Sequence, residues 1–276
     1  MADTAAQTVY RAEYVAGYEQ KKNLLRATVT IDAEIKGASA VILVSDSGGD
    51  VPSTRGLNGL VTAQDDNLTQ TTVTLVEWND LRKATNFNIF TSQGNRKKIM
   101  QDNSLAVMHR KIDLDILTAL ATCTQTTGVA KKASLDVFMH ALAILGNAVA
   151  TDGQVSCVIS PGAHAYLMQT TEFGSADFVD RKKFTGGILA AYNWAGIDFI
   201  VHPSIVGKGT SSEKLYMYNK SSVAHICDKE SITAEAGYMA EQGYSWARTQ
   251  AFMASKIIQN TGIVQILHDG SAYASV

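Results

Sequence analysis

Apolar positions recur at helical spacing in the middle of the chain. The segment RKKIMQDNSLAVMHRKIDLDILTALATC, which begins at Arg96, places its apolar residues close to one stripe. Such a stripe predicts an amphipathic helix of about 25 residues. A second helix is predicted from Ser134 to Ala150, because serine is a favoured N-cap residue and the turn pair Asp152-Gly153 follows. The stripe of the first helix consists of Ile99, Ala106, Ile112, Ile116 and Leu120.

Short apolar runs dominate the second half of the chain. QVSCVISPGAHAYL predicts a buried strand, a turn marked by Pro161 and a short helix, and GIDFIVHPSI predicts another buried strand. Further short strands are predicted in EKLYMYNK, AHICDK, ITAEAGYMA, ARTQAFMASKIIQ and GIVQILHDG. With its helices early and its strands late, the chain is predicted to have an α+β fold.

The first 90 residues follow a different pattern. Thr8 to Lys36 has apolar residues at helical spacing and predicts a partly helical arm that cannot bury a core by itself. Ala40 to Asp46 predicts a strand, and TTVTLVEWND predicts a returning strand. About 25 residues with little apolar content separate the two, and loops of this length are usually functional. An isolated hairpin is marginally stable in water, so we expect this one to lie on a neighbouring subunit.

Composition excludes several classes of protein. The 276 residues are 46% hydrophobic and 18% charged, with 24 Lys and Arg against 26 Asp and Glu. This excludes a globally disordered chain and disfavours a basic nucleic-acid binder. No run of 18 apolar residues occurs and the first residues lack the pattern of a secretory signal, so we expect no membrane span and synthesis in a reducing cytoplasm. We expect the three cysteines to be buried free thiols.

Motifs for catalysis or cofactor binding are absent from the sequence. Neither GxGxxG, GxxxxGK[ST] nor GxSxG occurs, and the pair Ser160 and His164 is better explained by a strand-to-helix turn with a capping serine. His109 and Asp113 could face one metal, but we expect a surface ion pair because Arg110 and Lys111 flank them. His140, His202 and His225 are expected as core or boundary residues. We therefore expect no enzyme, no cofactor and no metal.

Charge is segregated along the chain. Residues 46–80 carry a net charge of −5, from six carboxylates and one arginine, whereas basic residues form compact clusters elsewhere. Each cluster is either a solvated face, or part of an interface in which the acidic loop lies over a basic helix of a neighbour. The acidic candidates for such contacts are Asp46, Asp50, Asp65, Asp66 and Glu77. The basic candidates are Arg96, Lys97, Lys98, Arg110, Lys111, Lys131 and Lys132.

The order of these segments resembles that of the major capsid proteins of tailed bacteriophages, which share the Hong Kong 97-like fold. The resemblance rests on an arm, a long loop, NFNIFTSQ before a long helix, QVSCVISPGAHAYL after a second helix, GILAAYNWAGIDFIVHPS, and late strands ending in NTGIVQI. It implies an N-terminal arm (1–39), an extended loop (40–90), a peripheral (P) domain (91–152 and 230–276) with a long spine helix, and an axial (A) domain (153–229).

The resemblance also implies a function. The chain would assemble with itself as pentamers and hexamers into an icosahedral virion capsid around double-stranded DNA, bound without sequence specificity, in the host cell cytoplasm. A portal, a separate scaffolding protein and a decoration protein are the further partners it implies. The alternatives are the shell of a cellular nanocompartment of the same fold, or a small cytoplasmic α+β enzyme.

Two departures from the founding member of the fold qualify this resemblance. That member cross-links its shell through a lysine in the extended loop. Here Lys83 is the only lysine between Gly37 and Asn95, and it lies on the returning stem, so we expect no covalent cross-linking. The founding member also carries a long N-terminal scaffolding segment, whereas about 36 residues precede the first core strand here, so we expect separate scaffolding or none.

Overall fold

The computed structural model describes residues 20–30, 34–46, 51–55, 57, 59, 61, 63, 67–85, 96–171, 192–228 and 232–273. The strands in these ranges form three sheets, here called the central sheet, the β11 sheet and the hairpin sheet. The predicted α+β class is confirmed. Two parts of the sequence analysis lie outside the described residues. They are the segment NFNIFTSQ (86–93) and the part of the arm before Gln20.

The central sheet is covered on both faces. β5 and β7 are parallel, and the other neighbouring strands are antiparallel. Every residue of β5 is buried, as expected for a continuous apolar run between two covered faces. In spatial order the strands are β12 (Ile263–His268), β8 (Glu213–Asn219), β5 (Val155–Ile159), β7 (Ile197–Val201) and β6 (Tyr192–Trp194).

Helices α3 (Leu135–Asn147) and α4 (Pro161–Leu167) cover one face of this sheet. Phe138 of α3 meets Phe199 of β7 edge to face, with ring centroids 5.7 Å apart. Ser134 occupies the N-cap of α3 without a capping bond from its side chain. At α4 the backbone N–H of Ala163 donates to Ser160 Oγ at 3.0 Å, which confirms the predicted capped turn.

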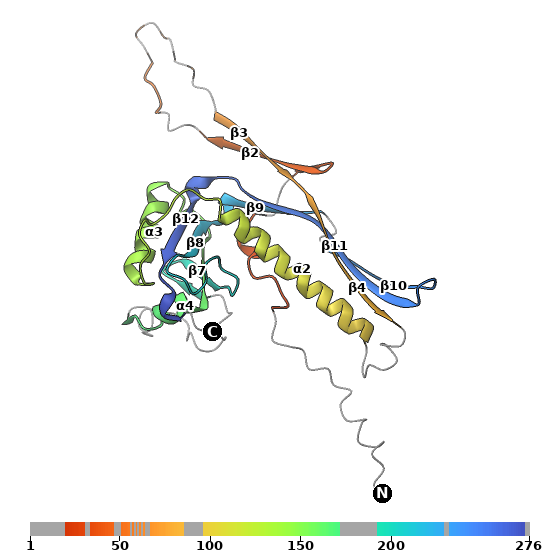
Figure 1. Ribbon diagram of the computed structural model, residues 1–276. Coiled ribbons are helices and arrows are strands. Elements are labelled where there is room, and N and C mark those ends of the chain that lie inside the picture. The colour runs from red at the N-terminus through yellow and green to blue at the C-terminus, as the bar shows by residue number, and fades with distance from the viewer. Residues whose placement is uncertain are drawn as a thin grey trace.

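The other face receives helix α2 (Arg96–Leu120) and the N-terminal segment around η2 (Arg26–Thr28). Leu25 and Val29 are fully buried in the main core, and Thr28 Oγ1 lies 2.6 Å from Tyr218 Oη of β8. The described part of the predicted arm therefore packs against its own chain. From left to right in Figure 1, α3, the central sheet, α2 and the β11 sheet form successive layers.

The β11 sheet lies along α2. Buried and less buried residues alternate along the first ten residues of β11, and the buried ones are mostly small, so the helix can approach closely. Ser104 Oγ of α2, for example, lies 2.6 Å from Thr249 Oγ1 of β11. At 14 residues β11 is one long strand, where the sequence predicts short ones. The strands are β10 (Thr233–Met239), β11 (Tyr244–Ile257), β4 (Val76–Thr85) and β9 (Val223–Cys227).

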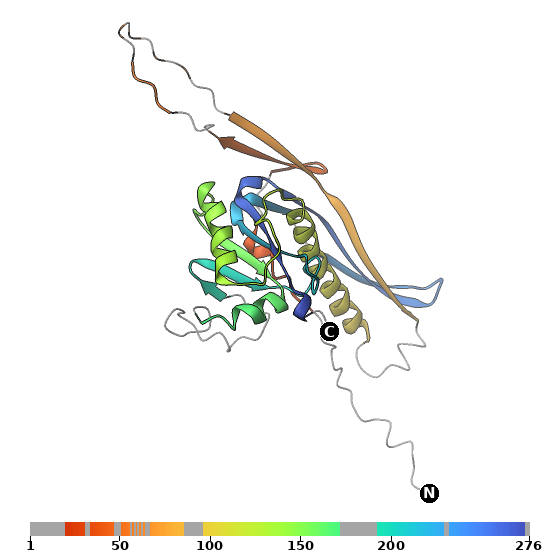
Figure 2. The ribbon, with the colours of Figure 1, turned by 60° about the vertical axis from the view of Figure 1, so that its left-hand side comes forward.

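The hairpin sheet projects from this body. It comprises β1 (Glu34–Lys36), β2 (Ser39–Asp46) and β3 (Asn67–Thr74), all antiparallel. Leu75 alone separates β3 from β4, so one extended segment belongs first to the hairpin and then to the β11 sheet. Figures 1 and 2 show β2 and β3 leading away from the end opposite the β10–β11 turn.

Candidate subunit interface

The hairpin is fixed to the body at its base. Ala40 and Val73 are paired across β2 and β3, and both are buried in a small apolar cluster with residues of β9 and β11. Lys256 Nζ of β11 also donates to the backbone oxygen of Thr72 at 2.9 Å. These contacts set the direction in which the hairpin leaves the body. The residues from β9 and β11 are Ala224, Ile226 and Ala254.

Beyond its base, the hairpin exposes apolar side chains. Leu43 is 67% exposed and Leu68 is 64% exposed, and the ladder places both on one face. Of the seven most exposed large apolar side chains in the described part of the chain, five belong to the hairpin or its tip. A concentration of this kind is typical of a contact surface. The three at the tip are Val51, Leu57 and Val61.

The acidic candidates do not form one group. Asp46 ends β2, whereas Asp50, Asp65 and Asp66 lie outside the described residues. Glu77 is exposed near the start of β4 and accepts from Asn79 Nδ2 at 2.7 Å and Gln250 Nε2 at 3.1 Å. Ten residues of strand separate Glu77 from Asn67, which corresponds to about 33 Å. Glu77 therefore belongs to the surface of the β11 sheet rather than to the tip.

The basic candidates occupy separate places. Arg96, Lys97 and Lys98 form the first turn of α2, which contains no acidic residue. Lys111 lies on α2 about 20 Å further along the helix, and its Nζ is 3.6 Å from the centroid of the Trp78 ring. A cation over an indole face is held by about 0.5–2 kcal/mol, so this ammonium group has a contact within its own chain. Arg110 is half-buried on the same helix.

Lys131 and Lys132 lie elsewhere again, between α2 and α3. The backbone of Lys131 forms a bridge with His268 at the end of β12, and the side chains of both lysines are exposed. Lys132 Nζ is 6.0 Å from the centroid of the Tyr166 ring. The basic triplet and the two basic pairs therefore do not merge into one patch. The triplet at the start of α2 is the densest of the three clusters.

Asp113 forms a polar centre that the sequence patterns do not reveal. It is fully buried on α2, and its carboxylate accepts from the backbone N–H groups of Leu24, at 2.9 and 3.1 Å, and of Leu25, at 3.1 Å. Gln20 Nε2 also donates to it. His202 Nε2 lies 3.3 Å away, and since His202 Nδ1 accepts from the N–H of Ser204, Nε2 carries the proton donated to Asp113.

This arrangement overturns the expected surface ion pair between His109 and Asp113. His109 Nδ1 instead lies 3.2 Å from Asn23 Nδ2, and burial lowers the pKa of its imidazole. The N-terminal segment covers this side of α2, which is why the carboxylate is withdrawn from solvent. Asp113 thereby fixes Gln20 to Leu25 on the helix.

Comparison with known proteins agrees with this geometry. A model of the phage capsid protein family matches residues 2–270 of the chain. The chain belongs to the phage capsid protein family. No curated protein matches it in sequence.

Solved structures show the fold of this capsid protein. It is similar to a structure of Mycobacterium phage Che8, with 16% identity, a TM-score of 0.67 and coverage of 94% of this chain and 95% of that one. It is similar to the capsid of Ralstonia phage GP4, with 12% identity, a TM-score of 0.72 and coverage of 97% and 96%. The SrpI encapsulin of Synechococcus elongatus PCC 7942 shares 9% identity at a TM-score of 0.69, with coverage of 100% and 99%. The fold is therefore Hong Kong 97-like, as the order of segments predicts.

His225 of the capsid protein lies between the side chains of Cys227 and Ser255. His225 Nε2 lies 3.2 Å from Cys227 Sγ, and His225 Nδ1 lies 2.8 Å from Ser255 Oγ. Burial raises the pKa of the Cys227 thiol and lowers the pKa of His225 to about 4. A nucleophilic cysteine needs the opposite, a thiolate beside a base that can hold its proton. His202 and His225 are buried as expected, whereas His140 is exposed on α3.

Two features are absent from the described ranges of the capsid protein. Among those residues no three or more His, Cys, Asp or Glu side chains are placed to hold a metal ion. None of the helices there is long and apolar enough to cross a membrane.

Proposed function

We propose that this capsid protein is the major capsid protein of a tailed bacteriophage, and that it assembles as pentamers and hexamers into an icosahedral shell around double-stranded DNA. The observation that carries the proposal is the projecting hairpin, whose apolar residues remain exposed on the isolated chain. Many weak contacts repeated over a shell add up to a stable container. Assembly in the host cytoplasm, a portal, a separate scaffolding protein and a decoration protein belong to the same proposal.

The proposed division of the chain follows the sequence. Residues 1–39 form the arm, 40–90 the extended loop, 91–152 and 230–276 the P domain, and 153–229 the A domain. α2 is the spine helix of the P domain in this division. β12, from the C-terminal part, pairs with β8 of the proposed A domain, so the central sheet joins the two domains.

For the interface, we propose that the acidic loop of one subunit meets the start of α2 on a neighbour. The first turn of α2 contains Arg96, Lys97 and Lys98 and no acidic residue, at the end of the helix dipole that disfavours cations. A negatively charged partner reverses this penalty. Complementary charge of this kind sets partner and register more than affinity.

A nanocompartment shell of the same fold is the second candidate. The likeness to the SrpI encapsulin, which extends over the whole chain, favours it, while the family match favours the phage capsid. The two differ in what the shell encloses. Nucleic acid that copurifies with the particle supports the phage capsid, and a copurifying protein cargo supports the nanocompartment.

Expression of the chain alone tests the proposal. We expect fast-sedimenting material that electron micrographs resolve as closed shells or as rings of five and six subunits. Dissolved under denaturing conditions, these particles should give a single band at the monomer mass of 29.6 kDa, because Lys83 lies on β4 rather than at the tip. A chain that stays monomeric even after a scaffolding protein is added would contradict the proposed assembly. A ladder of heat-stable multimers on the gel would contradict the expected absence of covalent cross-links.

Charge reversal tests the proposed interface. Asp65→Lys with Asp66→Lys places cations against the cations of α2, so we expect assembly, followed by light scattering, to fail at low salt and to recover partly as salt screens the repulsion. Lys97→Glu with Lys98→Glu in the same chain should restore it. Asp136→Lys with Asp152→Lys changes the net charge equally at exposed sites outside the loop and serves as the control. Unchanged assembly and salt dependence in the loop variant would remove support for this interface.

A further inference from the structure

Two histidines meet the N-terminal segment, residues 20–30, from different elements. On α2, Nδ1 of His109 lies 3.2 Å from Nδ2 of Asn23. On β9, the backbone N–H of the fully buried His225 donates to the carbonyl oxygen of Thr30 at 2.9 Å. The two histidines therefore lie near opposite ends of the segment, which Figure 1 shows in red beside α2.

Burial and charge keep both imidazole rings neutral at pH 7. Burial is the main reason why the pKa of each ring is lowered, and the pKa of His225 falls to about 4. Arg26, which lies on the segment between the two contacts, lowers both pKa values further, whereas Asp113 of α2 opposes the shift. Because the pKa of an exposed histidine is near 6.5, both rings bind a proton less readily than they would in water.

Asp113 has little capacity left for a further cation. Four donors already approach its carboxylate, which equals the number of lone-pair sites that a carboxylate offers. The ring of His225 also contacts Ser255 of β11, which does not titrate, and the thiol of Cys227 on its own strand, whose pKa burial raises. The other titratable groups that act on these rings or on their direct partners are His202, Asp115 and Asp228.

Acid should therefore loosen the segment. A proton on either ring adds a cation beside Arg26 in a buried site, where like charges repel more strongly than in water. Release of the segment removes Arg26 from the rings and lets water solvate them. Because the pKa of His225 is about 4 in the held state and near 6.5 in water, release becomes more favourable as the pH falls from about 6.5 to about 4.

We infer that His109 and His225 form an acid-sensitive switch, in which protonation of the two rings releases residues 20–30 from α2 and β9. At neutral pH the hydrogen bonds of Asp113 hold the segment, and the two histidines make this hold depend on pH. The switch belongs to one subunit, so it does not depend on the proposed shell. In the proposed division the segment is part of the arm (1–39), whose contacts would change on release, and this consequence alone rests on the proposed function.

Hydrogen exchange of the full-length chain tests this switch. The peptide that covers residues 20–30 reports the opening constant of the segment, once its exchange is corrected for the intrinsic rate at each pH. We expect this constant to rise about a hundredfold from pH 7 to pH 4, because the pKa of His225 changes from about 4 to near 6.5 on release. The amides of β5, which is buried along its whole length, should stay protected.

Two variants assign the pH dependence. His109→Gln with His225→Gln keeps hydrogen-bonding groups at both positions and removes both titrating rings, so the rise should fall to less than about tenfold. His140→Gln, on an exposed position of α3, is the control and should leave the rise unchanged. An equal rise in the wild type and the double variant would assign the effect to Asp113 and His202 and overturn the switch. Amides of β5 that open together with the segment would show global unfolding and overturn it as well.

Arg26 provides a second test if the double variant does not fold. Arg26→Gln removes the cation beside both rings but keeps the rings, so the rise with falling pH should be smaller than in the wild type. Arg26→Lys keeps the charge and should retain the wild-type rise. The same rise in Arg26→Gln and Arg26→Lys would contradict the repulsion between Arg26 and the protonated rings, and so overturn the inference.

Discussion

Asp113→Ala is expected to cost the capsid protein about 3–5 kcal/mol of unfolding free energy. The substitution removes a buried carboxylate and leaves the N–H groups of Leu24 and Leu25 without their acceptor. Hydrogen bonds to a charged group contribute about 1.5–3 kcal/mol each, and buried donors without a partner add a desolvation cost. Urea unfolding of the variant and the wild type measures the difference.

Local release of the N-terminal segment provides a second measure of the same effect. Once Asp113 is gone, the segment from Gln20 to Leu25 should open more often than the rest of the fold, so trypsin should cut faster at Lys21 and Lys22. Asp102→Ala, on an exposed position of the same helix, is the control and should change the unfolding free energy by less than about 0.5 kcal/mol. Equal behaviour of the two variants would show that Asp113 does not hold this segment.

Asp113 also shows where inference from sequence ends. Helix α2, the strand before Pro161 and the capped turn at Ser160 could be predicted, because hydrophobic period and capping are properties of neighbouring residues. The burial of Asp113 depends on a segment about 90 residues earlier that folds back over α2, and no local pattern encodes this. The expected ion pair with His109 was wrong for the same reason.

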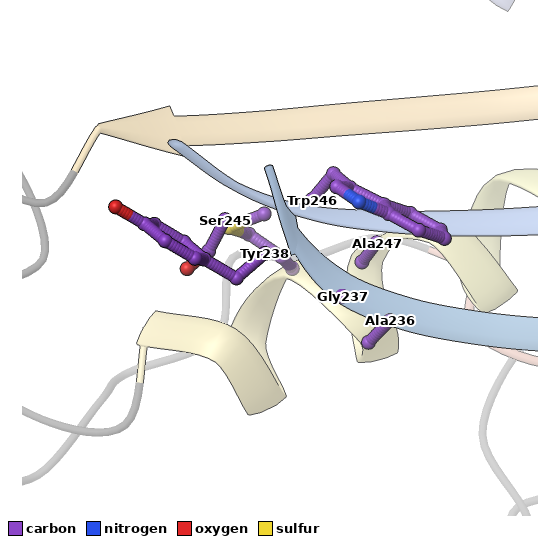
Figure 3. A pocket seen from close by; sticks show the side chains of 7 residues that line it. Ala236, Gly237, Tyr238, Ser245, Trp246 and Ala247 are labelled. Carbon is purple, nitrogen blue, oxygen red and sulfur yellow. The ribbon is translucent and has the colours of Figure 1, made fainter. Parts of the chain in front are cut away.

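The candidate interface shows the same limit. The projecting hairpin could be predicted from its two strands and the long polar stretch between them. Spatial grouping of the charged residues could not be predicted, because Glu77 lies on the β11 sheet far from the tip and Lys111 is held over Trp78. The close contact between Gly237 of β10 and Trp246 of β11 (Figure 3) could not be predicted either, because it depends on the register between two strands.

Replacement of residues 47–66 by the dipeptide Asn-Gly is expected to abolish shell assembly and to preserve the fold. Asp46 and Asn67 are directly paired at the end of the hairpin, and Asn-Gly is the preferred two-residue connection between paired strand ends. The body loses no core residue, because the described apolar residues of the tip are exposed. Shortening a loop of about twenty residues to two raises the unfolding free energy by at most about 2 kcal/mol, so the chain should remain folded and monomeric.

A loop of unchanged length distinguishes the effect of the side chains from the effect of loop length. In this second variant glycine and serine replace every residue from 47 to 66, so the hairpin spans the same distance without Leu57 or the aspartates. Both variants should sediment as folded monomers while the wild type forms particles, because both lack the side chains that we propose to contact a neighbouring subunit. Assembly of the glycine-serine variant alone would assign the loop a spacer role, and closed particles from the Asn-Gly variant would show that the body holds the shell together without the tip.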